Sequence, residues 1–251
     1  MHIKQPPDFT RDVAKGKMPA MSKILSIETS SELASAALLR GQKIIQRQTA
    51  GVMNHSQSIL PMVQSLLQEA GISLTECDAI AFGSGPGSFT GVRTACGVVQ
   101  GLAFGADLPV IPVVTLLALA EGCRYTTGAE HVVVAMDARM GEVYWAQYRY
   151  DVNQQIWCAV IEPALCAPEL VVPQYLDELR FVGNGFAAYA DKFTFNVESA
   201  HSAVPQASAV ARLAQIEFAA GRFYPADQAQ PLYLRNKIAL TIEERKVING
   251  N

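Results

Sequence analysis

The chain has 251 residues, of which half are hydrophobic and 17% are charged. That composition supplies a buried core and excludes an intrinsically disordered protein. The net charge is −3 and no run of basic residues occurs, so the chain is not expected to bind nucleic acid unaided, because phosphate binding needs clustered Lys and Arg. The five cysteines form no C-x-x-C pair, and no apolar stretch reaches the roughly 18 residues of a membrane span. We therefore expect a cytoplasmic protein without disulfides.

The first twenty residues differ from the rest. They are polar, carry Pro6, Pro7 and Pro19, and show no hydrophobic period, whereas a regular strand pattern follows Met21. We interpret residues 1–20 as a poorly ordered extension, or as the product of a start codon upstream of Met21. No function is assigned to them.

Residues 21–128 have the pattern of three strands followed by helix, strand and helix. Apolar runs separated by turn residues predict the strands, and apolar residues at helical spacing predict the helices. Gly71 stands where a helix C-cap is expected. The predicted elements are strands 23–28, 33–39 and 43–48, helix 54–70, strand 79–83, helix 90–104, strand 110–113 and helix 115–124.

Residues 129–236 repeat this layout. The predicted elements are strands 132–137, 142–150 and 155–161, helix 168–179, strand 180–183 and helix 208–220. Pro168 suits the first position of its helix, and Gly221 suits the end of the last one. The sequence thus predicts an α/β fold with a duplicated βββαβα layout in two lobes, 21–128 and 129–236. The last helix can pack back on the first lobe, and residues 237–251 form a C-terminal tail.

Each half places an acid at the end of its first strand, directly before a hairpin. The two segments are Ile27-Glu28-Thr29-Ser30 and Met136-Asp137-Ala138-Arg139. In a cleft between the lobes, paired acids and hairpin amides can hold a nucleotide's phosphates and its Mg²⁺. The alternative is that each acid only caps amides of its own turn.

A glycine-rich loop follows the strand 79–83 and leads into a helix, whose amides point at whatever occupies the loop. Gly85, Gly87 and Ser88 are therefore candidate phosphate-binding residues. The spacing is not that of a Walker A loop, a G-x-G-x-x-G turn or a nucleophile elbow. A rigid turn that brings two backbone segments close together explains the glycines equally well.

The helix after this loop carries Gly97, Gly101 and Gly105 at intervals of four. Glycine inside a helix costs about 1 kcal/mol relative to alanine, which favours close packing, here against the helix 54–70. That helix has an apolar stripe that includes Val63 and Leu66. Surplus apolar surface there would suit a partner helix, although core burial is the commoner explanation.

No catalytic residue and no metal site is assigned from the sequence. The four histidines, His2, His55, His131 and His201, are too scattered for H-x-x-x-H or H-E-x-x-H. No Ser-His-Asp or Cys-His set can be assembled either.

Four segments resemble the TsaB (YeaZ) family, over a span from about residue 23 to residue 236. The resemblance implies the ASKHA fold of actin, sugar kinases and Hsp70, in agreement with the duplicated layout. The segments are residues 24–30, Gly85-Pro86-Gly87-Ser88-Phe89-Thr90-Gly91-Val92-Arg93, Asp137-Ala138-Arg139-Met140-Gly141-Glu142-Val143-Tyr144 and Pro231-Leu232-Tyr233-Leu234-Arg235.

The resemblance also implies a function. TsaD, a paralogue of TsaB, holds a metal and transfers threonylcarbamoyl to adenosine 37 of tRNAs that read ANN codons. TsaB pairs with TsaD and, with the ATPase TsaE, supports that reaction, so tRNA would be met only through the complex. No second histidine stands four residues after His55, which fits TsaB rather than TsaD.

From the resemblance we further expect a homodimer when the chain is alone, and no cofactor of its own, with ATP or ADP possible in the complex. The possible nucleotide or phosphate-loop residues are Glu28, Thr29, Ser30, Gly85, Gly87, Ser88, Asp137 and Arg139. The family's first helix pair implies partner-interface residues His55, Ile59, Met62, Val63, Leu66, Gly97 and Gly101.

Two other functions stay open at this point. A self-sufficient ASKHA-type small-molecule kinase or ATPase would use Glu28, Asp137 and the glycine loops. A metallopeptidase reflects an older label for these relatives, and the missing metal-ligand spacing counts against it.

Overall fold

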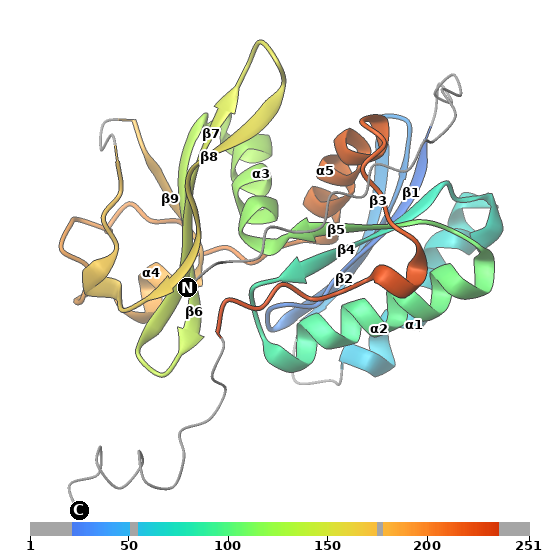
Figure 1. The fold of residues 1–251 in the computed structure, drawn as a ribbon, viewed down its shortest axis with the longest axis horizontal. Helices are drawn as coiled ribbons and strands as arrows, with labels where there is room; N and C mark the ends of the chain where they lie inside the picture. The colour runs from blue at the N-terminus through green and yellow to red at the C-terminus, as the bar shows by residue number, and fades with distance from the viewer. Residues whose placement is uncertain (1–21, 51–54, 175–177, 236–251) are drawn as a thin grey trace, which may run out of the picture.

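The computed structural model describes residues 22–50, 55–174 and 178–235, which form two lobes, each built on one sheet (Figure 1). The first sheet has the strand order β3-β2-β1-β4-β5. Strands β1 to β3 form an antiparallel meander, while β4 and β5 run parallel to β1. Their bounds are β1 Lys23–Glu28, β2 Leu33–Arg40, β3 Lys43–Ala50, β4 Ala79–Gly85 and β5 Val110–Val114.

Helices cover both faces of the first sheet, because side chains along a strand point to alternate faces. Leu25 and Ile27 of β1 pack with α1 (His55–Ala70) and α2 (Phe89–Ala106). Ile24 points to the other face and packs with α5 (Ala207–Ala219). Short 3-10 turns occur at Leu74–Glu76 and Ala226–Gln228. The first lobe therefore includes a helix that comes from the far end of the chain.

The second sheet has the order β8-β7-β6-β9 and is antiparallel except for the pair β6–β9. The strands are β6 His131–Arg139, β7 Glu142–Asp151, β8 Ile156–Cys166 and β9 Arg180–Val182. One face packs against α3 (Thr115–Thr127), and the other against α4 (Asn184–Ala188) and an aromatic cluster. That cluster consists of Phe181, Phe186, Phe193 and Phe195.

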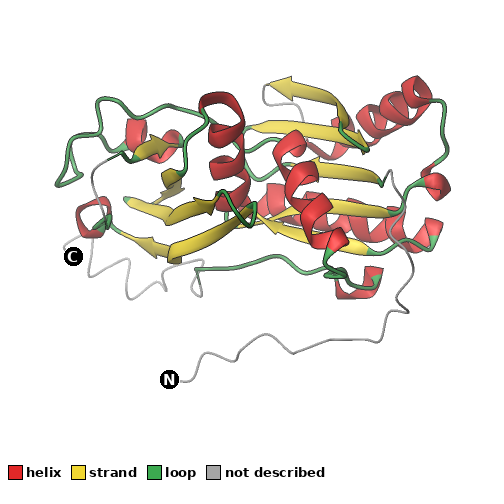
Figure 2. Ribbon diagram, turned by 90° about the horizontal axis from the view of Figure 1, so that it is seen from above, coloured by secondary structure: helices red, strands yellow, loops and turns green. Residues whose placement is uncertain are grey.

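The two lobes meet at α3 and α5, which lie side by side between the sheets (Figure 2). The indole nitrogen of Trp157 on β8 donates to Glu121 on α3 at 3.0 Å, and Arg212 of α5 pairs with the same carboxylate at 3.7 Å. Burial raises the pKa of Glu121, and the Trp157 hydrogen bond and the charge of Arg212 act against that rise. This side of the lobe junction is consequently held by polar as well as apolar contacts.

The α/β fold class and the two-lobed layout are confirmed, but the predicted helix 168–179 is wrong. Among the described residues of this range, only a 3-10 turn forms, at Pro168–Leu170, and Val171 is already extended with φ −73° and ψ 117°. Pro173 explains the stop, since it lacks an N–H donor and disfavours helical geometry in the residue before it. As far as the second half is described, it therefore has no counterpart of α1. The short helix α4, which the sequence did not predict, lies on the face of its sheet away from α3.

The other predicted strands and helices are present, and β8 continues to Cys166. The extension 1–20 and the tail 237–251 lie outside the described residues. Among the helices in the described part of the chain, none is long and apolar enough to cross a bilayer.

Candidate functional site

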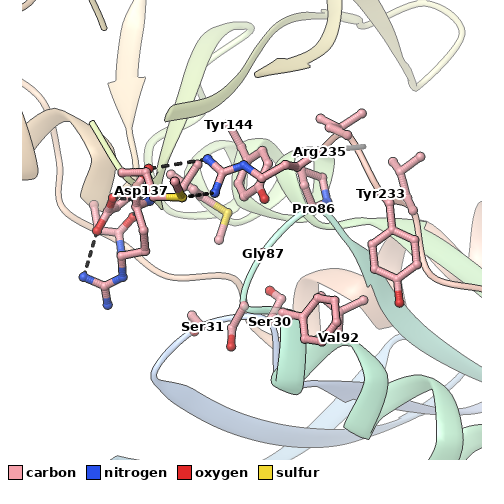
Figure 3. Close-up of a pocket in the computed structure, with 18 of the residues that line it drawn as sticks. Ser30, Ser31, Pro86, Gly87, Val92, Asp137, Tyr144, Tyr233 and Arg235 are labelled. Carbon is pink, nitrogen blue, oxygen red and sulfur yellow. Dashed lines mark hydrogen bonds and ion pairs between the residues drawn. The ribbon is translucent and has the colours of Figure 1, made fainter. Parts of the chain in front are cut away.

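A cleft of about 460 Å³ lies between the lobes, where β1 and β6 end (Figure 3). The first lobe contributes the β1–β2 turn and the start of α2. The second lobe contributes the β6–β7 hairpin, and the extended segment after Ala229 borders both. The lining residues include Ser30, Ser31, Pro86, Gly87, Ser88, Asp137, Arg139, Tyr144, Asn184, Tyr233 and Arg235.

Glu28 does not line this cleft. Its side chain is fully buried, and its Oε1 atom accepts a hydrogen bond from the Ser30 amide at 2.6 Å. The Oε2 atom has no hydrogen-bond partner among the described residues. Burial raises the pKa of Glu28, and the hydrogen bonds from Ser30 and Thr29 oppose the rise. The carboxyl group is thus both inaccessible from the cleft and biased toward its neutral form.

Asp137 lies at the cleft, but its oxygens are already engaged. Oδ1 accepts from the Arg139 amide at 2.7 Å and from the Tyr189 hydroxyl at 2.8 Å, and Oδ2 pairs with the Arg139 guanidinium at 3.0 Å. The Asp137 amide donates to Asn184 Oδ1 at 3.0 Å. The negative charge of Asp137 is thus paired with Arg139 of its own hairpin. This agrees with the alternative that the acid caps an amide of its own turn.

The glycine-rich loop packs directly on the β1–β2 turn. The Ser88 amide donates to the Ser30 carbonyl at 2.7 Å, and the Thr29 hydroxyl donates to the Gly91 carbonyl at 2.6 Å. A Cβ on Gly87 would lie 2.6 Å from the Ser30 carbonyl oxygen, and one on Gly91 would lie 1.8 Å from that of Thr29. Close backbone approach accounts for both glycines without a bound phosphate.

These residues do not fit a Mg²⁺-bound nucleotide. Hard cations need accessible oxygen ligands, and here one acid is buried while the other is paired with Arg139. Within the described ranges, no group of three or more His, Cys, Asp or Glu side chains could hold a metal ion. The cleft does keep one buried hydroxyl, that of Ser30, without a hydrogen-bond partner in the described part of the chain.

The outer face of α1 and α2 differs from the expected interface. Ile59, Val63 and Leu66 are at most 4% exposed and belong to the core of the first lobe, so they are not on the outer surface. Met62 is partly buried, and His55 begins α1, but the side chain of His55 lies outside the description.

Two other apolar residues are exposed there instead: Leu60 of the stripe at 49%, and Phe104, which sequence reasoning missed, at 81%. Leu60 follows Ile59, and Phe104 stands three residues after Gly101. Only the orientation of each helix shows which of its apolar residues face solvent. Gly97 and Gly101 are exposed, and a Cβ on either would meet nothing within 4 Å. Close packing against α1, expected from their spacing, is therefore not their role.

Known proteins resemble this chain over most of its length. A family model described as TsaD, tRNA N6-adenosine threonylcarbamoyltransferase, matches residues 37–247. The tRNA threonylcarbamoyladenosine biosynthesis protein TsaB of Haemophilus influenzae is 42% identical over 223 residues, covering 86% of this chain and 94% of the relative. The protein of the same name from Escherichia coli K12 is 41% identical, with 86% and 96% covered. The chain belongs to the TsaB (YeaZ) family.

Solved structures agree with this assignment. The TsaB-family protein YeaZ from Pseudomonas aeruginosa superimposes with a TM-score of 0.79 at 40% identity, covering 85% of this chain and all of that one. A second structure from the same organism, described as similar to peptidase YeaZ, gives a TM-score of 0.80 at 41% identity. The fold is accordingly the two-lobed ASKHA-like fold of the TsaB family.

The segments that carry the TsaB resemblance gather at one place in the structure. Residues from 85–93, 137–144 and 231–235 all line the interlobe cleft. Segments that are far apart in the sequence thus line one cleft.

Proposed function

We propose that this chain is an accessory subunit in the biosynthesis of tRNA threonylcarbamoyladenosine, without catalytic activity of its own. It pairs with TsaD and, together with TsaE, supports threonylcarbamoyl transfer to adenosine 37 of tRNAs that read ANN codons. The names of its relatives and the transferase described by the matching family model support this pathway.

The burial of Glu28 and the ion pair of Asp137 support the accessory role. An ASKHA enzyme that acts on a nucleotide needs carboxylates that reach the metal in the cleft. Here Glu28 is buried and Asp137 is neutralised by Arg139. A chain with these two groups is better suited to binding and activating a partner enzyme than to catalysing phosphoryl transfer.

The surface proposed for pairing is the outer side of α1 and α2, which we call the α1–α2 face. It consists of Leu60, Gly97, Gly101 and Phe104. Exposed apolar side chains favour burial against a partner, and glycines without neighbours let another helix approach closely. The same face would serve self-association when the chain is alone. Since the net charge is −3, contact with tRNA would pass through the partners.

The decisive experiment is a reconstitution with purified cognate TsaD, TsaE, tRNA and a threonylcarbamoyl donor. We expect modified adenosine only when this chain is present, and no ATP turnover by the chain alone. Full modification without the chain would remove the accessory role. ATP-dependent phosphotransfer by the isolated chain would establish the alternative, a self-sufficient ASKHA-type kinase or ATPase.

The pairing surface is tested separately by Leu60→Asp and Gly97→Leu. Both positions are exposed, so the variants should fold normally but lose binding to TsaD in a pull-down and lose activation in the reconstitution. Leu170→Asp is the matched control, since Leu170 is an equally apolar side chain, 68% exposed, on the second lobe. If Leu60→Asp and Leu170→Asp bind TsaD alike, another surface makes the contact.

A further inference from the structure

Residues 229–235 run from the first lobe to the second along the cleft, and we call this segment the strap (Figure 1). It starts on the first lobe, where the Ala229 carbonyl accepts a hydrogen bond from Cys96 Sγ of α2 at 3.4 Å. Three residues later the Leu232 amide donates to the Ser84 carbonyl at the end of β4, at 2.7 Å. Both contacts fix the strap to the buried part of the first lobe.

The middle of the strap fits closely against the glycine-rich loop. A Cβ on Gly85 would lie 2.8 Å from the Leu232 carbonyl oxygen. Next to it, the Arg93 guanidinium carbon lies 3.2 Å from the ring centroid of Phe89 and 4.9 Å from that of Tyr233. The cation therefore joins a ring of the strap to a ring of α2.

The end of the strap is attached to the second lobe. Arg235 pairs with Glu142 of β7 at 2.5 Å. It also donates to Met140 Sδ at 3.3 Å and to the Arg139 carbonyl at 3.5 Å (Figure 3). Its side chain is only 17% exposed. Met140 and Gly141 form the turn of this hairpin with φ values of 58° and 77°, and Arg139 has φ 62°. Arg235 thus holds a tight hairpin that belongs to the other sheet.

The lobes are also joined at α3 and α5, and no residue of these two helices lines the cleft. Two lobes joined at one such place would be free to hinge about it. A second connection across the cleft removes that freedom. We propose that the strap holds the two lobes of this chain at one fixed separation, so that the cleft does not open and close.

The test uses the full chain with a donor and an acceptor dye, attached through noncanonical residues at Gln68 on α1 and Asn153 in the β7–β8 turn. Both positions are exposed, and they report the distance between the lobes. The wild type should give a single narrow distance distribution. In Arg235→Glu the ion pair is replaced by a repulsion between two carboxylates. The fraction of molecules outside the wild-type distance range should then rise by about fivefold.

Two further variants make the result specific. The double variant Arg235→Glu with Glu142→Arg restores the ion pair with exchanged charges and should recover the narrow distribution. Arg222→Glu is the matched control, because Arg222 pairs with Glu217 at the end of α5, away from the cleft. Should Arg235→Glu fail to fold, Arg235→Gln removes the charge while keeping most of the side-chain length.

An unchanged distribution in a folded Arg235 variant would overturn the proposal, and so would equal broadening in Arg222→Glu. The measurement is made on the isolated chain, and its outcome is therefore independent of whether the chain pairs with TsaD.

Discussion

The carboxyl group of Glu28 occupies the space in which a side chain at position 83 would begin. A Cβ on Gly83 would lie 1.8 Å from Glu28 Oε2 and 2.6 Å from its Cδ. Neighbouring strands β1 and β4 bring the two residues together, and both are buried. The glycine gives room to an acid that has no accessible counter-charge.

Glu28→Gln should make the free energy of unfolding less dependent on pH. Burial raises the pKa of Glu28 above its ordinary value of 4.5, so over the interval between the two values the folded state holds a proton that the unfolded chain has released. Stability is therefore fully present below pH 4.5 and declines as the pH rises through the raised pKa. Glutamine has the shape of the neutral acid and removes this decline.

Urea unfolding at several pH values from 4 to 9 measures the effect. The wild type should lose stability toward alkaline pH, and Glu28→Gln should lose less. Glu32→Gln serves as the control, since Glu32 is exposed in the same turn. Parallel curves for wild type and Glu28→Gln would contradict a buried neutral carboxyl.

Gly83→Ala and Gly97→Ala should act in opposite directions. At position 83 the added methyl group overlaps the Glu28 carboxylate, and overpacking of this kind costs about 1–3 kcal/mol of unfolding free energy. At position 97 the methyl group meets nothing within 4 Å, and alanine in place of glycine inside a helix gains about 1 kcal/mol. Chemical denaturation of both variants compares them directly. A loss at position 97 would mean that the exposed glycine is needed for folding.

Leu66→Ala should lower the free energy of unfolding by about 2–5 kcal/mol, because Leu66 is fully buried on the inner side of α1. Leu60→Ala should change it by about 0.5 kcal/mol or less, since that side chain is half exposed on the same helix. Thermal or urea unfolding separates the two. Similar losses for both would place Leu60 in a contact that the isolated chain does not contain, such as a homodimer.

Mg²⁺ and ATP together should leave the melting temperature of the isolated chain unchanged. A ligand present at 100 times its dissociation constant stabilises a protein by about 2.7 kcal/mol, which for a chain of this size raises the melting temperature by several degrees. Differential scanning fluorimetry with Mg²⁺ alone as the control detects such a shift. A rise that requires both Mg²⁺ and ATP would argue for a nucleotide site despite the pairing of Asp137 with Arg139.

The strand and helix periodicities identified most of the fold, because each lobe repeats the same local signals. The helix predicted over 168–179 was wrong because Pro168 suits the start of a helix, whereas Pro173 prevents its continuation. Sequence also placed Glu28 and Asp137 at the ends of corresponding strands; β1 does end at Glu28, while β6 continues two residues past Asp137 to Arg139. The sequence could not show that one is buried behind Gly83 and the other paired with Tyr189, since both contacts involve residues distant in the chain.

The helix surface shows the same limit. Ile59 and Leu60 are adjacent and both apolar, and the 100° turn between them decides that one is core and the other surface. The sequence alone does not show how the helix is rotated about its axis against the sheet. The proposed partner residues therefore changed from the buried stripe to Leu60 and Phe104.

The exchange of helices between the two halves has a consequence for how the chain can be divided. The inner face of the first sheet is covered by α5, which comes from beyond residue 200, whereas Leu116, Leu119 and Ala120 of α3 pack on the second sheet. A fragment ending at residue 128 would leave Ile24, Leu39 and Ile111 facing water. Neither half is a self-contained folding unit, and fragments cut at the middle of the chain should be soluble only when they are produced together.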